Sequence, residues 1–405
     1  MADMLRGRRS ARPIQLAVLV SRFPELSQTF VLDQVAALID AGFDVTVFAG
    51  RRARGGLRHA TGRALAGHGR YADRALLPRL LNLPGFSAGL RRRAHERALR
   101  RLHRQAAAGF DLLLCHFGPV GLQAVAASRG LARAAPIWTI FHGYDVSRFI
   151  VEQGEDAYAH LFRHGDRFLP ISRLWQRRLA GLGCPEDRIG LLRMGVDCER
   201  IEFAPRPRAD GPLRILTVGR LVEKKGTAFA LAALAHLQQA APELRWVFEV
   251  AGDGPLEQPL RQAAGELGLG ERVSFLGALS SSEVQARLRQ ADIFLLPSIV
   301  AADGDMEGIP VALMEAMAAG VPVVSTFHSG IPELVEHGVS GLLAPERDPA
   351  ALAEQLRTLI ESPSTSHSLA LAARAKIEAE FNQRRINAGL AESIAERVAG
   401  KAALD

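Results

Sequence analysis

The chain has 405 residues, of which 48% are hydrophobic and 6% aromatic, and it carries a formal net charge of +7. A chain of this length and apolar content exceeds one ordinary hydrophobic core, so we expect two domains of about 200 residues each. The three cysteines, Cys115, Cys184 and Cys198, have neither paired nor metal-type spacing. This pattern argues against a disulfide framework and favours a reducing compartment.

The beginning of the chain is polar and basic up to Pro13, and the apolar run that follows, residues 14–20, is only as long as a strand. No secretory signal is therefore expected. The best membrane-span candidate, residues 309–327, contains Glu315, two prolines and Gly320, which favours a helix, a turn and a strand in a soluble core. We expect a cytoplasmic protein, with peripheral attachment at the inner face of the plasma membrane as a further option.

The first half alternates strand-like and helix-like segments. Residues 14–20 and 44–49 are apolar and strand-like, and residues 30–41 between them are helical in pattern and end at Gly42. This is a βαβ unit of ordinary length. Three further strand-like runs follow, at residues 112–115, 137–141 and 167–171. The pattern predicts an open parallel sheet.

Arginine is concentrated between Arg51 and Arg104, where 15 arginines face only Asp73 and Glu96. Part of this segment, residues 90–108, is helical in pattern with few apolar residues to bury. A solvated arginine-rich helix is one interpretation. The other is attachment to an anionic membrane surface, to which each basic residue contributes roughly 1 kcal/mol. Nucleic acid ranks last because no aromatic residues are interleaved and no nucleic-acid module is recognisable.

The second half repeats the alternation after residues 204–212, a Pro- and Gly-containing stretch that is the best linker candidate. We expect an N-terminal domain over residues 1–204, a linker over 205–212, a second domain over 213–367 and a C-terminal helical segment over 368–405. Ligands bind beyond the carboxyl ends of strands in open parallel sheets, so two such domains facing a cleft would hold a ligand there. The expected elements are strands at 213–218, 246–251, 273–276 and 293–297, and helices at 226–239, 256–267, 281–290 and 368–399.

Glu307 and Glu315 bracket an apolar helix start in the sequence Glu-Gly-Ile-Pro-Val-Ala-Leu-Met-Glu. Pro310 suits the first position of a helix, and Gly308 allows the backbone to approach a bound group closely. The N–H groups at a helix start favour anions or hydroxyls, and carboxylates accept hydrogen bonds from sugar hydroxyls. Solvated glutamates are the alternative, but the apolar surroundings of Glu315 predict a buried helix whose carboxylate needs a partner.

Lysine is rare in this chain, and Lys224 and Lys225 lie side by side in the loop after a predicted strand, close to Arg220. Compact ammonium groups suit diphosphate oxygens, whereas a solvated turn is the alternative. His142 follows the strand at 137–141 and should lie at the carboxyl edge of the first sheet. Asp145 could orient its imidazole or cap the next segment.

Several motifs together resemble the retaining nucleotide-sugar glycosyltransferases of the two-Rossmann-domain type, known as glycosyltransferase group 1 or family 4. They cover most of residues 211–360 and comprise Glu307-x7-Glu315, Val218–Gly226, Ala251–Pro255, Phe294–Ser298, Gly320–Val324 and Ser329–Glu333. More weakly, Ser21–Pro24, Ser27–Phe30 and Phe141–Asp145 resemble the branch that makes colanic acid and related exopolysaccharides. The resemblance implies an α/β fold of two Rossmann-like doubly wound domains facing a cleft, the GT-B type, with the C-terminal helix crossing back to the first domain.

The resemblance also implies roles for individual residues. Arg220 and Lys225 would bind the donor diphosphate, with Lys224 solvated. Glu307 and the amides of Gly308 and Ile309 would position the hexose, Glu315 would bind the nucleotide ribose, and His142 would contact the sugar or assist the leaving group. Many relatives have a glycine pair where this chain has Ser27, Gln28 and Thr29, so the resemblance does not extend to phosphate contacts from that loop.

The implied activity is transfer of a hexose from a nucleotide-diphosphate sugar to a lipid-linked glycan acceptor, in exopolysaccharide or lipopolysaccharide biosynthesis. No cofactor and no metal are expected, although Asp303 and Asp305 have an Asp-x-Asp spacing; we expect that loop to be solvated or to touch the acceptor. Expected partners are the nucleotide sugar, the lipid-linked oligosaccharide and an anionic membrane surface, but no nucleic acid. A nucleotide-sugar epimerase and a non-catalytic scaffold in polysaccharide assembly stay open as alternatives.

Overall fold

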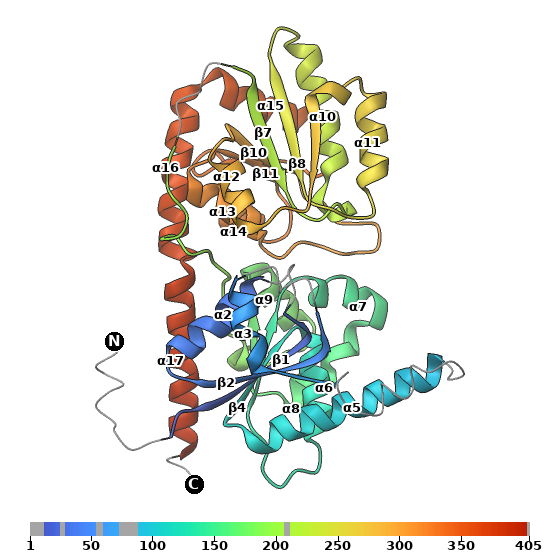
Figure 1. The fold of residues 1–405 in the computed structure, drawn as a ribbon, viewed down its shortest axis with the longest axis vertical. Helices are drawn as coiled ribbons and strands as arrows, with labels where there is room; N and C mark the ends of the chain where they lie inside the picture. The colour runs from blue at the N-terminus through green and yellow to red at the C-terminus, as the bar shows by residue number, and fades with distance from the viewer. Residues whose placement is uncertain (1–11, 25–28, 54–59, 73–87, 206–210, 403–405) are drawn as a thin grey trace. The chain divides into compact units, whose positions relative to one another are not determined.

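The computed structural model describes residues 12–24, 29–53, 60–72, 88–205 and 211–402. The loop of Ser27 and Gln28 lies outside these residues. The chain divides into two compact units. Unit 1 comprises Met1–Ile140, Tyr158–Leu169 and Asn387–Asp405, and unit 2 comprises Phe141–Ala157 and Pro170–Ile386. Each unit contains one six-stranded sheet (Figure 1).

The sheet of unit 1 has the strand order β3-β2-β1-β4-β5-β6. The pairs β1 with β2, β1 with β4, β2 with β3 and β4 with β5 are all parallel. This order is that of a doubly wound Rossmann sheet. Strand β1 is buried on both faces from Leu16 to Val20, as expected for a continuous apolar run in a parallel sheet. The strands are β1 (Gln15–Phe23), β2 (Asp44–Arg52), β3 (Gly69–Tyr71), β4 (Leu112–His116), β5 (Ile137–Phe141) and β6 (Arg167–Pro170).

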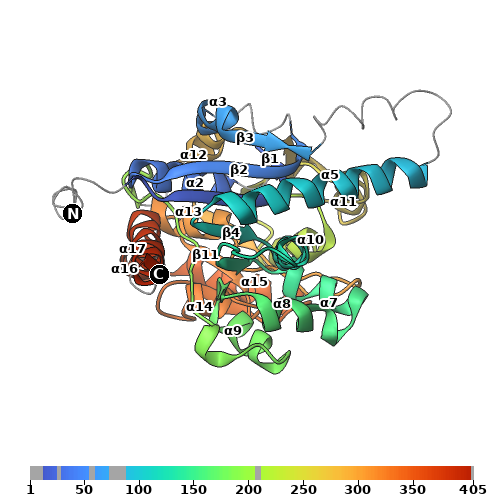
Figure 2. The ribbon, with the colours of Figure 1, turned by 90° about the horizontal axis from the view of Figure 1, so that it is seen from below.

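The helices around this sheet form two groups, α2 with α3 and α5 with α6 and α8. The long helix α5 packs on the sheet through one stripe: a side chain at Gly50 of β2 would lie 3.8 Å from His95 and from Leu99, and His103 is buried. Its N-terminal end extends past the strands (Figure 2). The bounds are α2 (Thr29–Asp40), α3 (Ala60–Leu65), α5 (Ala88–Gly109), α6 (Gly118–Ser128), α7 (Arg148–Gln153), α8 (Ala159–His164) and α9 (Arg173–Gly181), of which α7 and α9 belong to unit 2.

The sheet of unit 2 has the order β12-β11-β10-β7-β8-β9, which is the same doubly wound order read from the opposite edge. The pairs β7 with β8, β8 with β9, β7 with β10, β10 with β11 and β11 with β12 are parallel. The carboxyl ends of β7, β10 and β11 therefore lie at one edge. The strands are β7 (Leu213–Val218), β8 (Trp246–Ala251), β9 (Val273–Gly277), β10 (Ile293–Leu296), β11 (Val323–Thr326) and β12 (Leu342–Ala344).

Two hydrophobic clusters cover the two faces of this sheet. One contains buried residues of α10, α11 and α15, and the other contains buried residues of α12, α13, α14 and α16. Helix α13 contributes an almost continuous buried run from Leu313 to Ala319, which is why its sequence is apolar on nearly every face. The bounds are α10 (Thr227–Ala240), α11 (Glu257–Glu266), α12 (Ser281–Leu288), α13 (Val311–Ala319), α14 (Ile331–Leu334), α15 (Pro349–Glu361), α16 (Pro363–Glu380) and α17 (Gln383–Ala402).

The C-terminal segment differs from the single helix expected over residues 368–399. The structure has two helices, α16 and α17, interrupted at Phe381 and Asn382. Val196 donates its N–H to the carbonyl of Phe381 at 3.0 Å and accepts the N–H of Gln383 at 3.0 Å. This short bridge between two backbone segments occupies the groups that a continuous helix would need.

One other sequence expectation is refined. Pro310 was expected at the first helical position, but its backbone is extended with ψ at 122°, so it is the N-cap and α13 begins at Val311. In the described part of the chain, no helix combines the length and the apolar character needed to cross a membrane. The three cysteines are unpaired and buried, and burial raises the pKa of Cys184 to about 12.

Candidate functional site

Loops that follow three neighbouring strands of unit 2 meet at the carboxyl edge of its sheet. They are residues 219–226 after β7, residues 297–310 after β10 and residues 327–330 after β11. Gly226 fixes the contact between the first two: it has a φ of +66°, and a side chain there would lie 1.8 Å from the carbonyl oxygen of Pro297. Only glycine fits such a turn against another backbone. The predicted residues Lys225 and Glu307 therefore come from loops in direct contact.

Glu307 and Lys225 form a buried ion pair, with Nζ of Lys225 2.9 Å from Oε1 of Glu307. Glu307 is 6% exposed. Burial alone would raise the pKa of this carboxyl, but the ammonium groups of Lys225 and Lys224 outweigh burial and hold its pKa below the ordinary value. The site thus keeps an ionised carboxylate, a strong hydrogen-bond acceptor, beside a cation.

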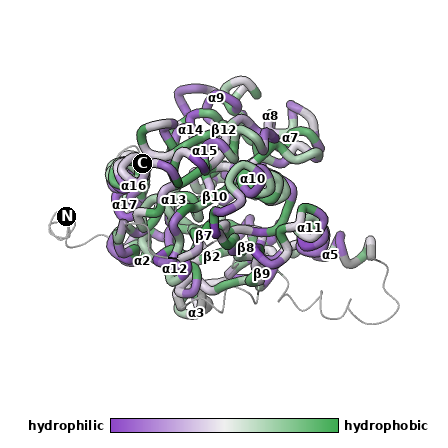
Figure 3. The backbone as a smooth tube through the Cα atoms, turned by 90° about the horizontal axis from the view of Figure 1, so that it is seen from above, coloured by the Kyte–Doolittle hydropathy of each residue, from purple (hydrophilic) through white to green (hydrophobic). Residues whose placement is uncertain are grey.

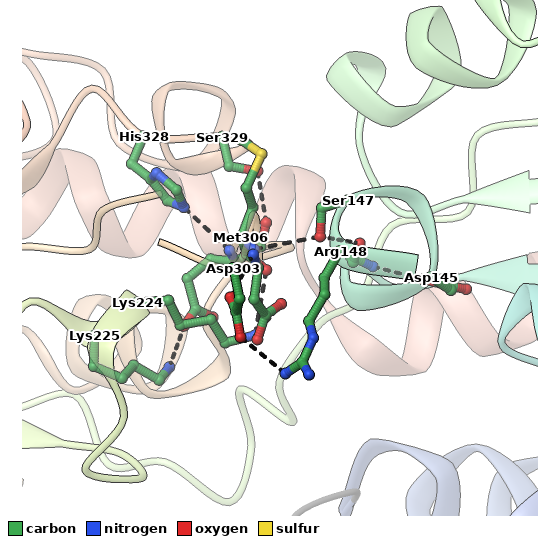
Figure 4. A network of polar contacts seen from close by, with 12 residues as sticks. Asp145, Ser147, Arg148, Lys224, Lys225, Asp303, Met306, His328 and Ser329 are labelled. Atoms are coloured by element: carbon green, nitrogen blue, oxygen red, sulfur yellow. Dashed lines mark hydrogen bonds and ion pairs between the residues drawn. The ribbon is translucent and has the colours of Figure 1, made fainter. Parts of the chain in front are cut away.

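The backbone of Glu307 is held by two residues of the loop after β11. Its N–H donates to Nε2 of His328 at 3.1 Å, and its carbonyl accepts the hydroxyl of Ser329 at 2.6 Å. Figure 4 shows His328 and Ser329 on one side of Met306 and Ser147 on the other. The N–H of Met306 donates to the hydroxyl of Ser147 at 3.3 Å. The segment that ends in Glu307 is therefore fixed from both sides.

The acidic loop before Glu307 is paired with basic side chains, although Asp303 remains exposed, and the expected contact of this loop with the acceptor stays a prediction. Asp303 lies 2.9 Å from Arg148, and the two side chains point toward each other in Figure 4. Asp305 lies 3.1 Å from Lys224, which also donates to the carbonyl of Met306 at 3.2 Å. The expectation of a solvated Lys224 was thus wrong, because its partner is distant in sequence. Among the described residues, no group of three or more His, Cys, Asp or Glu side chains could hold a metal ion.

The backbone at His142 and Gly143 packs directly against the backbone at Gly308, next to Glu307. A side chain at Gly308 would lie 2.2 Å from the carbonyl oxygen of His142, and one at Gly143 would lie 2.9 Å from the N–H nitrogen of Gly308. Asp145 accepts the N–H groups of His142 and Gly143, each at 2.9 Å. Asp145 thus holds the backbone of the turn that precedes it. The turn brings the predicted His142 to the backbone segment that joins Glu307 to α13.

The other predicted residues are placed by their elements. Arg220 is exposed directly after β7, and the adjacent Gly219 lies against Lys225, whose Cε would be 3.1 Å from a side chain at that glycine. Ile309 is buried. Glu315 lies in the second turn of α13 and is half-buried, on a helix whose apolar residues are mostly buried, as predicted.

Two polar residues of the site were missed in the sequence. His328 is fully buried, and its Nδ1 lies 2.7 Å from Oε1 of Glu346. The histidine directly precedes the Ser329–Glu333 motif, which was the available signal, whereas Glu346 follows a different strand and no spacing rule connects the two. Glu333 of the same motif accepts the N–H groups of Arg173 and Leu174 at 3.0 and 2.9 Å, so it caps helix α9.

Comparisons with known proteins identify the class. Residues 199–376 match the family model described as "Glycosyl transferases group 1", and residues 27–200 match "Glycosyltransferase Family 4". The putative colanic acid biosynthesis glycosyltransferase WcaL of Escherichia coli (strain K12) is 42% identical over 91% of this chain and 97% of its own. The amylovoran biosynthesis glycosyltransferase AmsK of Erwinia amylovora is 41% identical over 95% of this chain and 100% of its own. The chain therefore belongs to the group 1 glycosyltransferases, and it is an enzyme of the transferase class.

Solved structures agree in fold. HepE of Anabaena, solved in complex with UDP-glucose, has a TM-score of 0.74 at 20% identity, covering 95% of this chain and 100% of that chain. Sucrose-phosphate synthase from Thermosynechococcus elongatus has a TM-score of 0.76 at 19% identity, covering 96% and 100%. Together with the two doubly wound sheets, these similarities confirm the predicted α/β fold with two Rossmann-like domains of the GT-B type.

Proposed function

We propose that this glycosyltransferase is a retaining enzyme that moves a hexose from a nucleotide-diphosphate sugar to a lipid-linked glycan acceptor in exopolysaccharide assembly. The observation that carries the proposal is the ionised, buried Glu307 beside Lys225 at the carboxyl edge of the second sheet. The names of the relatives WcaL and AmsK support the exopolysaccharide context. The UDP-glucose complex of HepE supports a nucleotide sugar as the donor.

In this proposal the diphosphate oxygens of the donor bind Arg220 and Lys225, because compact and planar cations complement phosphate charge. Glu307 accepts from hexose hydroxyls, the amides of Gly308 and Ile309 donate to the sugar, and Glu315 accepts from the ribose. His142 contacts the sugar or assists the leaving group. Positioning and electrostatic stabilisation of the oxocarbenium-like state supply the rate enhancement, and the leaving diphosphate helps to deprotonate the acceptor hydroxyl.

The test of this function is nucleotide release from a panel of nucleotide sugars, with and without a lipid-linked oligosaccharide, with products followed by mass spectrometry. We expect release that depends on the acceptor, and an extended acceptor as the second product. Excess chelator should leave the rate unchanged, because Asp303 and Asp305 are already neutralised by Arg148 and Lys224. Accumulation of an epimerised donor without release would establish an epimerase instead. Binding without any turnover in all acceptor arms would favour a scaffold.

We also propose that α5 attaches the enzyme to an anionic membrane surface. His95, Leu99 and His103 lie toward the sheet, and α5 also packs against α6, so only part of its circumference is exposed. The end of α5 that is visible in Figure 3 includes hydrophilic residues. Exposed arginines of α5 include Arg92, Arg93, Arg97, Arg100, Arg101 and Arg104, of which Arg104 donates to the carbonyls of Ala127 and Arg129. A lipid-linked acceptor would place the substrate at the same surface.

Replacing Arg97, Arg100 and Arg101 together by glutamine should weaken co-sedimentation with anionic vesicles by on the order of a hundredfold, because each arginine contributes about 1 kcal/mol. Binding of the unchanged protein should fall steeply as salt rises and vanish with neutral lipid. The matched control removes the same charge from the exposed positions Arg245, Arg289 and Arg357 of unit 2. Equal losses in the two triple variants would reduce the proposal to a general effect of net charge.

A further inference from the structure

The loop between β10 and α13 is held by paired backbone contacts at two points. At its far end, the N–H and the carbonyl of Glu307 bind His328 and Ser329, as described above. At its near end, the N–H of Val300 donates to Oε2 of Glu346 at 2.8 Å, and the carbonyl of Val300 accepts from the guanidinium of Arg347. In each case two consecutive residues of a neighbouring loop occupy both polar backbone groups of one residue.

A side-chain contact joins these two points. Nε2 of His328 accepts the N–H of Glu307, so the proton of the neutral imidazole resides on Nδ1. Nδ1 therefore donates to Oε1 of Glu346 at 2.7 Å, while Oε2 of the same carboxylate accepts from Val300. The result is a continuous chain of hydrogen bonds from Val300 through Glu346 and His328 to Glu307.

The histidine in the middle of this hydrogen-bonded series is buried, so the loss of either of its contacts carries an energetic cost. His328 is 0% exposed, and a buried polar group that loses its partner costs about 1–3 kcal/mol. Small displacements of Glu307 are therefore opposed by an imidazole that is itself fixed at its other nitrogen. Carboxylate-to-histidine contacts of this kind fix the ring orientation and the tautomer of the histidine.

We infer that His328 and Glu346 are positioning residues for sugar transfer, which act by fixing the backbone of Glu307 and the start of its loop at Val300. This inference rests on the proposed function of Glu307 as the group that binds the hexose. Both imidazole nitrogens of His328 and both carboxylate oxygens of Glu346 are engaged in these contacts, so we assign neither side chain a direct contact with the sugar. Loss of the hydrogen bond between His328 and Glu307 should therefore lower kcat of transfer more than it changes KM for the donor.

Two substitutions of His328 distinguish the contribution of Nε2, which binds Glu307, from that of Nδ1, which binds Glu346. In His328→Gln the amide reaches the position of Nε2 and can still accept from Glu307, whereas in His328→Asn the shorter amide stays near Nδ1 and can reach only Glu346. We expect His328→Gln to keep most of the kcat of the unchanged enzyme and His328→Asn to lose at least tenfold, because one buried hydrogen bond at the reacting position is lost. Glu346→Ala should lower kcat as well.

Hydrogen exchange of the backbone amides provides a readout that does not depend on turnover. In His328→Asn the amide of Glu307 should exchange faster, and in Glu346→Ala the amide of Val300 should do so. His328→Gln should protect Glu307 nearly as well as histidine does. Ser329→Ala is the control on the same loop, because it removes the contact to the carbonyl of Glu307 and leaves its N–H bonded.

The outcomes are distinguishable. Equal kcat and equal amide protection in the Asn and Gln variants would overturn the positioning role, and so would a loss confined to thermal stability. If the variants show the expected exchange pattern but the unchanged enzyme transfers no sugar from any donor, the proposed function fails. The hydrogen bonds that fix the loop at Val300 and Glu307 would still be confirmed. Should His328→Asn not fold, the comparison of His328→Gln with Glu346→Ala carries the same test.

Discussion

Replacing Glu307 by glutamine should lower the rate of sugar transfer by at least tenfold. A hydrogen bond to a charged group contributes about 1.5–3 kcal/mol, and each 1.4 kcal/mol or so corresponds to a factor of ten in rate. Binding of the nucleoside diphosphate should not weaken, because Lys225 loses its partner at 2.9 Å and becomes more available to phosphate oxygens. Lys225→Ala should weaken that binding. Steady-state kinetics together with calorimetry of nucleotide binding measures the two effects.

A matched control exists on helix α11. Glu257 also lies 2.9 Å from a basic side chain, that of Arg261, but on an exposed helix surface. Glu257→Gln removes a carboxylate from an ion pair of the same length and should change neither transfer nor nucleotide binding. Near-normal turnover in Glu307→Gln, or equal losses in the two glutamine variants, would remove Glu307 from the proposed mechanism.

The ionisation of Glu307 also affects stability in a defined direction. Because its pKa in the folded protein lies below the ordinary value of 4.5, its contribution to the free energy of unfolding is fully present above pH 4.5. That contribution is lost as the pH falls through the lower pKa of the folded state. The difference in stability between the unchanged protein and Glu307→Gln should therefore narrow only in acid.

Gly308→Ala should cause the second large effect, a loss of transfer accompanied by a loss of stability. The added methyl group would lie 2.2 Å from the carbonyl oxygen of His142 and 2.5 Å from Cδ1 of Ile171. Overpacking of this kind costs about 1–3 kcal/mol, and more where a backbone must move. The turn of His142 would be displaced from Glu307. Activity and thermal unfolding of the same preparation measure the two losses.

Gly265→Ala is the corresponding control. Gly265 lies in α11, where a side chain would meet nothing within 4 Å, so alanine should leave transfer unchanged and stabilise the helix slightly. If Gly308→Ala retained full activity and stability, the close approach of the His142 turn to the Glu307 segment would not matter for function.

Most strands and the main motifs were predictable because their signals are local, whereas β3 and β12, of 3 residues each, were not predicted. Strands β1, β7 and β10 are short apolar runs, and the Gly308 and Pro310 pattern predicts a close approach followed by a helix start. The pairing of Lys224 with Asp305 was not predictable, since it depends on how the loops after β7 and β10 meet. The contact between His328 and Glu346 depends on the order of β10, β11 and β12 in the sheet, which no local pattern encodes.

Helix boundaries show the same limit. The sequence of the C-terminal segment is helical throughout in composition, and nothing in it predicts an interruption at Phe381. The interruption arises because Val196, from a distant part of the chain, bonds to the backbone on either side of Asn382. A single arginine, Arg193, further fixes this point by lying over the ring of Phe381 with its guanidinium carbon 4.9 Å from the ring centre.

The loop held at Val300 and Glu307 has a thermodynamic consequence for ligand affinity. Fixing the backbone of one residue costs about 1–2 kcal/mol of conformational entropy. The hydrogen bonds at Val300 and Glu307 restrain this loop when the chain folds. A donor that binds beside Glu307 therefore does not have to order the loop, and less of the gross interaction energy is lost on association. Calorimetry should then show a small heat-capacity change for nucleotide binding, in contrast to the large negative value that accompanies the folding of a loop around its ligand.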